Sequence, residues 1–263
     1  RDLHSFPTRR SSDLVVEFQN NQAASGGAVS IAPGGEATFD GATFTNNSAT
    51  GNGGAVSVTG KATFNGAVTF KDNTAEGDGG AVYLDEAAVE FPSGVSFEKN
   101  QAKNGGAVAL SDSANSKATF NGNTLSPNTA TANGGSLYIP GSAAVLFNAP
   151  QSFTGNKAAN GGAIWAASLA APTQPLTFTN NAASANGGAL YLGAAATVPN
   201  LLTFKTNKAA KGGAVYAASN LTVSGGSFTE NTASESGGAI YAAGTATVTG
   251  GTFEAGKIGR AHV

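Results

Sequence analysis

The sequence has no cysteine and no methionine, and its few histidines and arginines all lie within ten residues of the two ends. Residues 11–259 therefore offer no imidazole, thiol or guanidinium to serve as a catalytic base, a nucleophile or an anion clamp. The absence of arginine also argues against a nucleic-acid partner, because a strip of basic residues supplies most of that affinity. No apolar run approaches the length of a membrane-spanning helix, about 20 residues.

The two ends differ from everything between them. Residues 1–14 (RDLHSFPTRRSSDL) and 257–263 (KIGRAHV) each resemble the translation of a sequencing-adapter oligonucleotide. We interpret them as adapter-derived artefacts, and we expect residues 15–256 to be an internal fragment whose signal peptide or anchor would lie outside it. The ends hold five of the 14 basic and two of the 16 acidic residues. Residues 15–256 therefore contain 9 basic and 14 acidic residues, a net charge of −5.

A Gly-Gly pair recurs along the fragment, and it is followed by Ala or Ser and then by Val, Leu or Ile. The pairs begin at residues 26, 53, 79, 105, 134, 161, 187, 212 and 237, at intervals of 25 to 29 residues. A Phe-x-x-Asn unit begins eight or nine residues before each pair, except in the fifth copy, where Leu125 and Asn128 take those places. An extra Phe-x-x-Asn copy, Phe120 and Asn123, stands one strand earlier. A fixed period of this length is the signature of a repeat architecture.

Each repeat contains three short apolar stretches bounded by Gly, Asn, Ser or Asp, a pattern that predicts strands. Three strands and three turns in about 26 residues predict one coil of a parallel β-solenoid. The fold class is therefore all-β: a right-handed parallel β-helix of about nine coils, right-handed because that is the default for parallel crossovers. Equivalent residues would then lie about 4.8 Å apart and form columns.

The columns assign a structural role to each repeated residue. We predict that the Phe-x-x-Asn phenylalanines form one core column and that Phe39, Phe64, Phe91, Phe120 and Phe147 form a second, continued by Val198, Val223 and Val248. The asparagines should lie in a turn, with left-handed backbone and a bond to the coil above. Gly-Gly should supply positive φ or close approach between coils. The repeat motif is represented by Phe44, Asn47, Gly53, Gly54, Phe178, Asn181, Gly187, Gly188, Phe204, Asn207, Gly212 and Gly213.

The sequence gives little support to catalysis or metal binding. An acidic group clusters within one coil, and it consists of Asp72, Glu76, Asp78, Asp85, Glu86 and Glu90. These carboxylates suit either a solvated turn or a Ca²⁺ site, but the nonapeptide repeat of calcium-binding β-rolls is absent. We therefore expect no catalytic residues, no metal and no cofactor, and we expect that the protein is not an enzyme.

One set of residues is a candidate contact surface for a partner. All five tyrosines and the single tryptophan occupy the same position of the repeat: Tyr83, Tyr138, Trp165, Tyr191, Tyr216 and Tyr241. Strand alternation should turn them outward, so that five consecutive coils display an aromatic stripe about 20 Å long. Amphipathic aromatic side chains are favoured at interfaces. Alternatively, the stacked rings only stabilise one face of the solenoid.

Units such as FTNNAASANGGALY (178–191), FKTNKAAKGGAVY (204–216) and FTENTASESGGAIY (228–241) resemble the paired repeats of the chlamydial polymorphic membrane proteins. The resemblance covers residues 15–256. It implies the passenger domain of an autotransporter, located at the outer membrane and cell surface or secreted, that acts as an adhesin in virulence. It also implies a host-cell protein or glycan receptor as partner, a possible homo-oligomer, and membrane attachment only through a barrel outside this fragment.

Two other functions stay open from the sequence. A carbohydrate-active β-helix enzyme, of the polysaccharide lyase or hydrolase kind, would need an acid–base pair, for which Asp85 and Glu86 are the available candidates. A passive structural spacer would need neither a reactive pair nor a contact surface.

Overall fold

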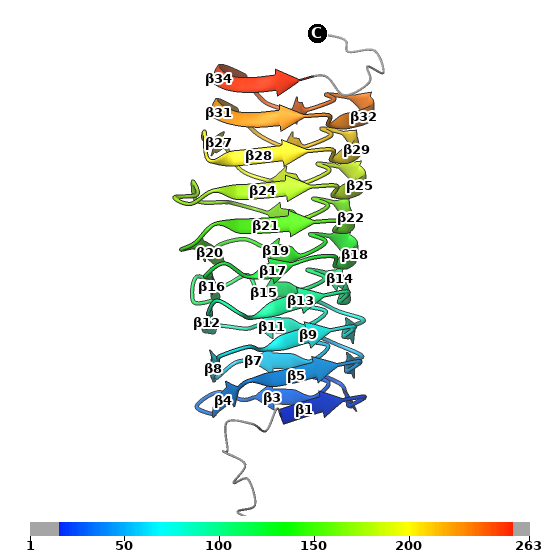
Figure 1. The fold of residues 1–263 in the computed structure, drawn as a ribbon, viewed down its shortest axis with the longest axis vertical. Coiled ribbons are helices and arrows are strands. Elements are labelled where there is room, and N and C mark those ends of the chain that lie inside the picture. The colour runs from blue at the N-terminus through cyan, green and yellow to red at the C-terminus, as the bar shows by residue number, and fades with distance from the viewer. Residues whose placement is uncertain (1–15, 255–263) are drawn as a thin grey trace, which may run out of the picture.

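The computed structural model describes residues 16–254, which wind through stacked coils of short parallel strands (Figure 1). The adapter-like ends, residues 1–14 and 257–263, lie outside the described residues. Consecutive copies of each strand pair in parallel, as in Phe18 with Phe44 and Phe178 with Phe204. The prediction of a parallel β-solenoid with about nine coils is therefore confirmed.

Three long sheets form the sides of the solenoid. The phenylalanine sheet holds the strand of each Phe-x-x-Asn unit: β1 (Val16–Gln19), β5 (Ala42–Thr45), β9 (Thr69–Lys71), β13 (Ser96–Glu98), β17 (Thr124–Leu125), β21 (Gln151–Thr154), β24 (Leu176–Thr179), β28 (Leu202–Lys205), β31 (Leu221–Thr229) and β34 (Ala246–Glu254). The aromatic sheet follows each Gly-Gly pair: β3 (Val29–Ile31), β7 (Val56–Val58), β11 (Val82–Leu84), β15 (Val108–Leu110), β19 (Leu137–Ile139), β23 (Ile164–Ala166), β26 (Leu190–Leu192), β30 (Val215–Ala217) and β33 (Ile240–Ala242).

The third side, the alanine sheet, comprises β2 (Gln22–Ala23), β6 (Ser48–Ala49), β10 (Thr74–Ala75), β14 (Gln101–Asn104), β18 (Thr129–Asn133), β22 (Lys157–Asn160), β25 (Ala182–Asn186), β29 (Lys208–Lys211) and β32 (Thr232–Ser236). The strands that carry the second Phe and Val column are β4 (Glu36–Asp40), β8 (Lys61–Asn65), β12 (Ala88–Phe91), β16 (Lys117–Phe120), β20 (Ala144–Phe147) and β27 (Ala196–Val198). In the last two coils this strand merges into β31 and β34.

The sequence pattern did not predict the strand that each coil contributes to the alanine sheet. The apolar stretches predicted three strands per coil, whereas the structure has a fourth, two to five residues long, directly after the Asn corner. Its inward residue is alanine in every coil, for example Ala75, Ala102 and Ala209 at 3%, 5% and 3% exposure. A single small inward residue among polar ones gives too weak an alternation to be recognised as a strand.

The core contains the two predicted phenylalanine columns, together with the inward aliphatic residues of the aromatic sheet such as Leu84, Ile164 and Val215. Within the first column neighbouring rings stack with centroids 4.6–5.1 Å apart and interplanar angles of 4–15°. Rings of the second column meet those of the first edge-to-face, for example Phe91 against Phe97 at 5.2 Å and 85°. Both geometries are favoured by the aromatic quadrupole and add about 0.5–1.5 kcal/mol per pair beyond area burial.

The fifth coil departs from the motif without breaking the core. Leu125 pairs with Phe97 on one side and Phe153 on the other, so it fills the first column as predicted. Phe120 of the extra Phe-x-x-Asn copy lies in the second column, between Phe91 and Phe147.

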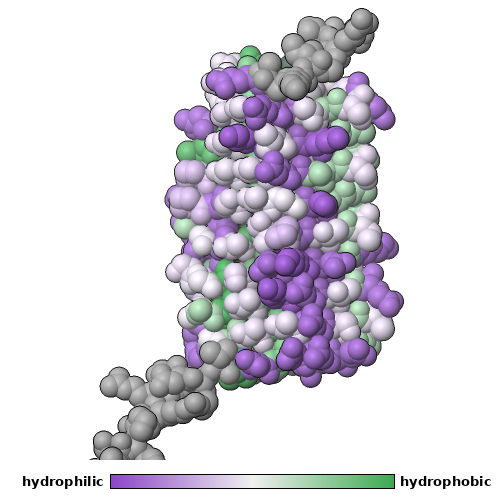
Figure 2. All heavy atoms as spheres, turned by 45° about the vertical axis from the view of Figure 1, so that its right-hand side comes forward, coloured by the Kyte–Doolittle hydropathy of each residue, from purple (hydrophilic) through white to green (hydrophobic). Residues whose placement is uncertain are grey.

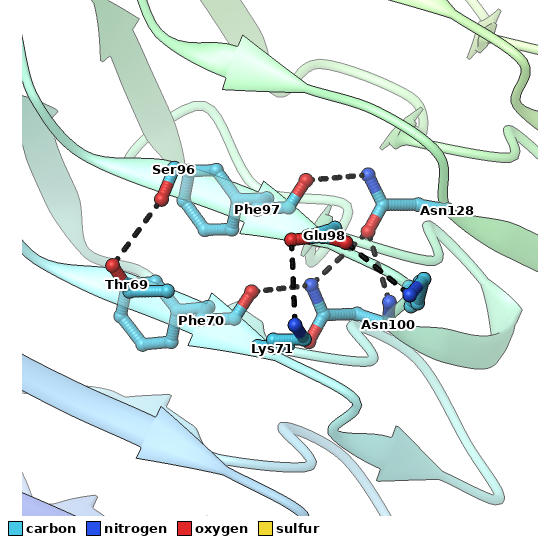
Figure 3. Close-up of polar contacts among 9 residues, drawn as sticks. Thr69, Phe70, Lys71, Ser96, Phe97, Glu98, Asn100 and Asn128 are labelled. Carbon is cyan, nitrogen blue, oxygen red and sulfur yellow. Dashed lines mark hydrogen bonds and ion pairs between the residues drawn. The ribbon is translucent and has the colours of Figure 1, made fainter.

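The motif asparagines form a continuous buried ladder (Figure 3). The Nδ2 of Asn100 donates to the Oδ1 of Asn128 in the next coil and to the carbonyl oxygen of Phe70 in the preceding coil, both at 3.0 Å. The backbone N–H of Asn100 donates to the same Oδ1 at 3.0 Å. Asn47, Asn73, Asn156, Asn181 and Asn207 repeat this pattern. Asn128 differs, because its Nδ2 donates to the Oγ of Ser136 at 3.4 Å, and Ser136 in turn donates to the Oδ1 of Asn156 at 2.8 Å.

The expected left-handed backbone lies one residue earlier than predicted. Asn46, Asp72, Lys99 and Thr206 have φ between 53° and 56°, whereas the ladder asparagines do not have positive φ. The ladder asparagine needs a backbone that directs its amide into the interior, so the preceding exposed residue makes the turn. In five coils that residue is Asn, Asp or Gly, for example Asn46 and Asn180, which are types that tolerate positive φ well.

The two glycines of each pair have different roles, and the structure shows both of the predicted ones. The first glycine has positive φ in all nine copies, for example 65° at Gly187. The second approaches the next coil so closely that a Cβ on Gly188 would overlap the carbonyl oxygen of Gly213. Each glycine is therefore required for a reason that the other does not share.

The buried ladder should be the most sensitive polar feature of the fold. We predict that Asn181→Ala lowers the free energy of unfolding by about 2–4 kcal/mol, because it removes the buried acceptor of two Asn156 N–H groups and the side-chain donor to the Phe153 carbonyl. Urea denaturation followed by circular dichroism measures this loss. Asn186→Ala in the same coil is the matched control, because its amide is only partly buried and donates one bond, to Asn160. Equal losses in the two variants would contradict the prediction.

Candidate functional site

An outward-facing column of aromatic side chains runs along the aromatic sheet over five consecutive coils. Strand pairing places the following residues in one register, and we call them the aromatic stripe: Tyr138, Trp165, Tyr191, Tyr216 and Tyr241. The flanking residues are buried, as Leu190 and Leu192 are at 1% and 3% exposure beside the half-buried Tyr191. Strand alternation therefore turns the aromatic side chains outward, as the sequence pattern predicted.

The rings of the stripe stack on one another along the solenoid axis. Neighbouring ring centroids are 5.0–5.5 Å apart, and from Trp165 to Tyr241 the interplanar angles are only 10–14°. Each ring face is therefore covered by the next ring. A partner would meet ring edges, which carry the positive part of the quadrupole, and the polar hydroxyl and indole groups.

Tyr83 occupies the same repeat position but stands apart from the stripe. It pairs with Ala109, which in turn pairs with Tyr138, so that one coil without an aromatic residue separates the two tyrosines. Ala109 is fully buried. The structure thus brings five of the six predicted contact residues together and leaves Tyr83 separate.

Burial and nearby carboxylates alter the acidity of the tyrosines. Burial, followed by the negative charges of Asp85 and Asp78, raises the pKa of Tyr83 to about 12. The pKa of Tyr138 is also raised, mainly by burial and then by Asp78. For Tyr191 burial is again the main cause of a raised pKa. These phenols therefore stay neutral hydrogen-bond donors well above physiological pH.

The acidic group of residues 72–90 is distributed around its coil. Asp72 lies at the corner after β9, Glu76 and Asp78 follow β10, Asp85 and Glu86 follow β11, and Glu90 lies in β12. Within residues 16–254 the structure contains no group of three or more His, Cys, Asp or Glu side chains that could hold a metal ion. Two of the carboxylates accept hydrogen bonds from neighbouring coils: Asp78 from Asn104 at 2.7 Å, and Glu90 from Asn121 at 2.9 Å.

A second amide ladder, which the sequence reasoning missed, runs along the corner between the alanine and aromatic sheets. Its members, the corner ladder, immediately precede the Gly-Gly pairs and are buried or partly buried: Asp78, Asn104, Asn133, Asn160 and Asn186. Each Nδ2 donates to the preceding coil at 2.7–3.1 Å, and Asp78 accepts at the end. The signal was present in the sequence, since a polar residue precedes every Gly-Gly pair, but adjacency to the stronger glycine motif concealed it.

The raised tyrosine pKa values predict how stability depends on alkaline pH. A phenol whose pKa is higher in the folded than in the unfolded chain stabilises the fold below pH 10, and this contribution is lost as the pH rises toward 12. We predict that phenolate absorbance shows a component titrating near pH 12, and that Tyr83→Phe removes it. Tyr241→Phe is the control and should leave that component in place. A Tyr83 that ionises at its ordinary pKa of 10.0 would contradict the assigned burial.

Comparison with known proteins identifies the fold family. The model of a family described as the right-handed β-helix region matches the chain twice, at residues 8–149 and 65–253. Searches of curated proteins and of solved structures found no match. Among the described residues there is no helix long and apolar enough to cross a membrane. The fold occurs in enzymes and in non-enzymes, and the right-handed winding agrees with the prediction from parallel crossovers. Since the two matches together span most of the chain, the protein belongs to the right-handed β-helix family.

Proposed function

We propose that this chain is part of an autotransporter passenger displayed at the bacterial surface, and that its aromatic stripe contacts a receptor on a host cell. The observation that carries the proposal is the stripe itself: five half-exposed aromatic residues in one register on five successive coils. The β-helix fold is consistent with a passenger domain, and the coupled Phe-x-x-Asn and Gly-Gly-Ala units support the assignment to a surface adhesin.

The geometry of the stripe defines the chemistry of the contact. Because the ring faces are covered, the stripe offers hydroxyl groups and ring edges at intervals of 5.0–5.5 Å. The stacked neighbours hold the rings in place, so a partner binds them with little loss of side-chain entropy. Tyrosine and tryptophan are also the residues most often found at energetic hot spots of interfaces. A protein surface or a glycan with acceptor groups along one edge fits this arrangement.

The proposal predicts a loss of cell binding when the stripe is truncated. The variant Tyr191→Ser/Tyr216→Ser/Tyr241→Ser of the full chain should bind cultured epithelial cells at least about ten-fold more weakly, because truncation of a hot-spot aromatic costs more than about 1 kcal/mol. Flow cytometry with labelled protein measures the binding. The corresponding Tyr→Phe variant separates the two contributions, since it retains the rings and removes only the hydroxyl groups.

Two further measurements make the test specific. Thr177→Ala/Thr203→Ala changes two outward residues of the phenylalanine sheet and should leave binding unchanged. Circular dichroism must show that the stripe variant keeps its β-type spectrum. Unchanged cell binding by a folded stripe variant would contradict the contact role and favour a structural spacer. Sedimentation of the same proteins shows whether the stripe instead joins two copies of this chain.

A further inference from the structure

The charges of the protein are segregated along the solenoid axis. Between Asp112 and Glu230 the sequence contains five lysines and no acidic residue, although the fragment as a whole is acidic. The lysines of this acid-free section are Lys117, Lys157, Lys205, Lys208 and Lys211. All except Lys117 belong to strands of the phenylalanine and alanine sheets: Lys205, Lys208 and Lys211 lie in one coil, and Lys157 lies two coils earlier. Positive charge is therefore concentrated on one part of the surface.

Two of these lysines flank a shallow groove on the alanine sheet. Strand pairing places Lys157, Ala182 and Lys208 in one column, so the two ammonium groups belong to coils about 10 Å apart with a methyl group between them. The groove has a volume of about 420 Å³. Its remaining lining consists of alanines and of the hydroxyl-bearing Ser184 and Ser234. The site thus combines two cations, a flat apolar floor and hydroxyl groups.

The flanking lysines are not neutralised by the protein. The four ion pairs within residues 16–254 involve Lys61, Lys71, Lys99 and Lys211, and therefore neither Lys157 nor Lys208. Figure 2 shows that strongly hydrophilic side chains gather in the lower half of the face drawn there and are scattered among paler ones above. In the earlier coils Glu98 pairs with two lysines.

We propose that this groove, which we call the lysine groove, binds a linear anionic polysaccharide that runs along the solenoid axis. Lys157 and Lys208 would each meet one of its acidic groups, and the sugar rings would lie on the partly exposed methyl groups of Ala182 and Ala210, within hydrogen-bond reach of the serine hydroxyls. The charge complementarity of an acid-free section favours a polyanion. A nucleic acid is disfavoured, because the groove contains neither arginine nor an exposed aromatic face on which bases stack.

The test uses dextran sulfate as the probe and neutral dextran as its uncharged counterpart. The full chain should bind dextran sulfate and not dextran, with an affinity that falls as salt is added. Lys157→Gln/Lys208→Gln should weaken binding about ten-fold, because each exposed lysine contributes up to about 1 kcal/mol. Biolayer interferometry with the immobilised polysaccharide measures both effects.

The matched control removes the same charge elsewhere. Lys103→Gln/Lys117→Gln changes two exposed lysines, in β14 and β16, that like the groove lysines take part in none of the four ion pairs within residues 16–254, and it should alter the affinity by less than about two-fold. Equal losses in the two double variants would overturn the proposal, because binding would then depend on net charge alone. Equal or tighter binding of duplex DNA would also overturn it. The stripe variant Tyr191→Ser/Tyr216→Ser/Tyr241→Ser should retain dextran sulfate binding, so failure of the adhesion proposal is distinguishable from failure of this one.

Discussion

Parallel hydrogen bonding between successive coils is the constraint on which the rest of the structure depends. It places each residue directly above the equivalent residue of the neighbouring coil, about 4.8 Å away, so the side chain at every position must tolerate contact with an equivalent side chain. Phenylalanine rings gain from such contact by stacking, and asparagine amides gain by donating to one another. Glycine is needed at the corner where the backbones of neighbouring coils approach too closely for any side chain. The repeated Phe, Asn and Gly residues are therefore the types that can stack on copies of themselves.

The same constraint explains why charge is scarce and how it is arranged. Like charges stacked directly above one another repel, whereas phenyl, methyl and amide groups do not. Charged residues make up only 11% of the chain. Where lysines share a column, as Lys157 and Lys208 do, an alanine separates them. Elsewhere opposite charges occupy neighbouring coils, as in the pair of Lys71 and Glu98 at 3.8 Å. In the lysine groove the two lysines are kept apart by an alanine, and neither belongs to an ion pair within residues 16–254.

The sequence was sufficient to predict the fold class, the two core columns and the roles of the glycines, because these positions repeat and their residue types have few alternatives. It did not reveal the alanine sheet, whose single inward alanine carries too little hydrophobic contrast. It also misplaced the left-handed residue, because two amide or carboxylate residues often stand side by side at this corner, as in Asn46–Asn47 and Asn180–Asn181, and the more regularly repeated second residue was chosen. The outward orientation of Tyr191 followed from alternation, whereas the coverage of its ring faces depended on ring orientation, which no pattern encodes.

Because the inward positions and corners are fixed by the repeat, specific function has to arise where outward columns depart from it. The aromatic column is interrupted at Ala109 and continuous from Tyr138 to Tyr241. The corner ladder ends where Lys211 replaces asparagine, and there the Nζ of Lys211 lies 5.7 Å from the centroid of the Tyr241 ring. At this corner the stripe and the lysine-bearing face meet, and Lys211 also pairs there with Glu235 at 3.8 Å. These departures from the repeat make the two ends of the outward surface chemically different, which a uniform array of coils could not do.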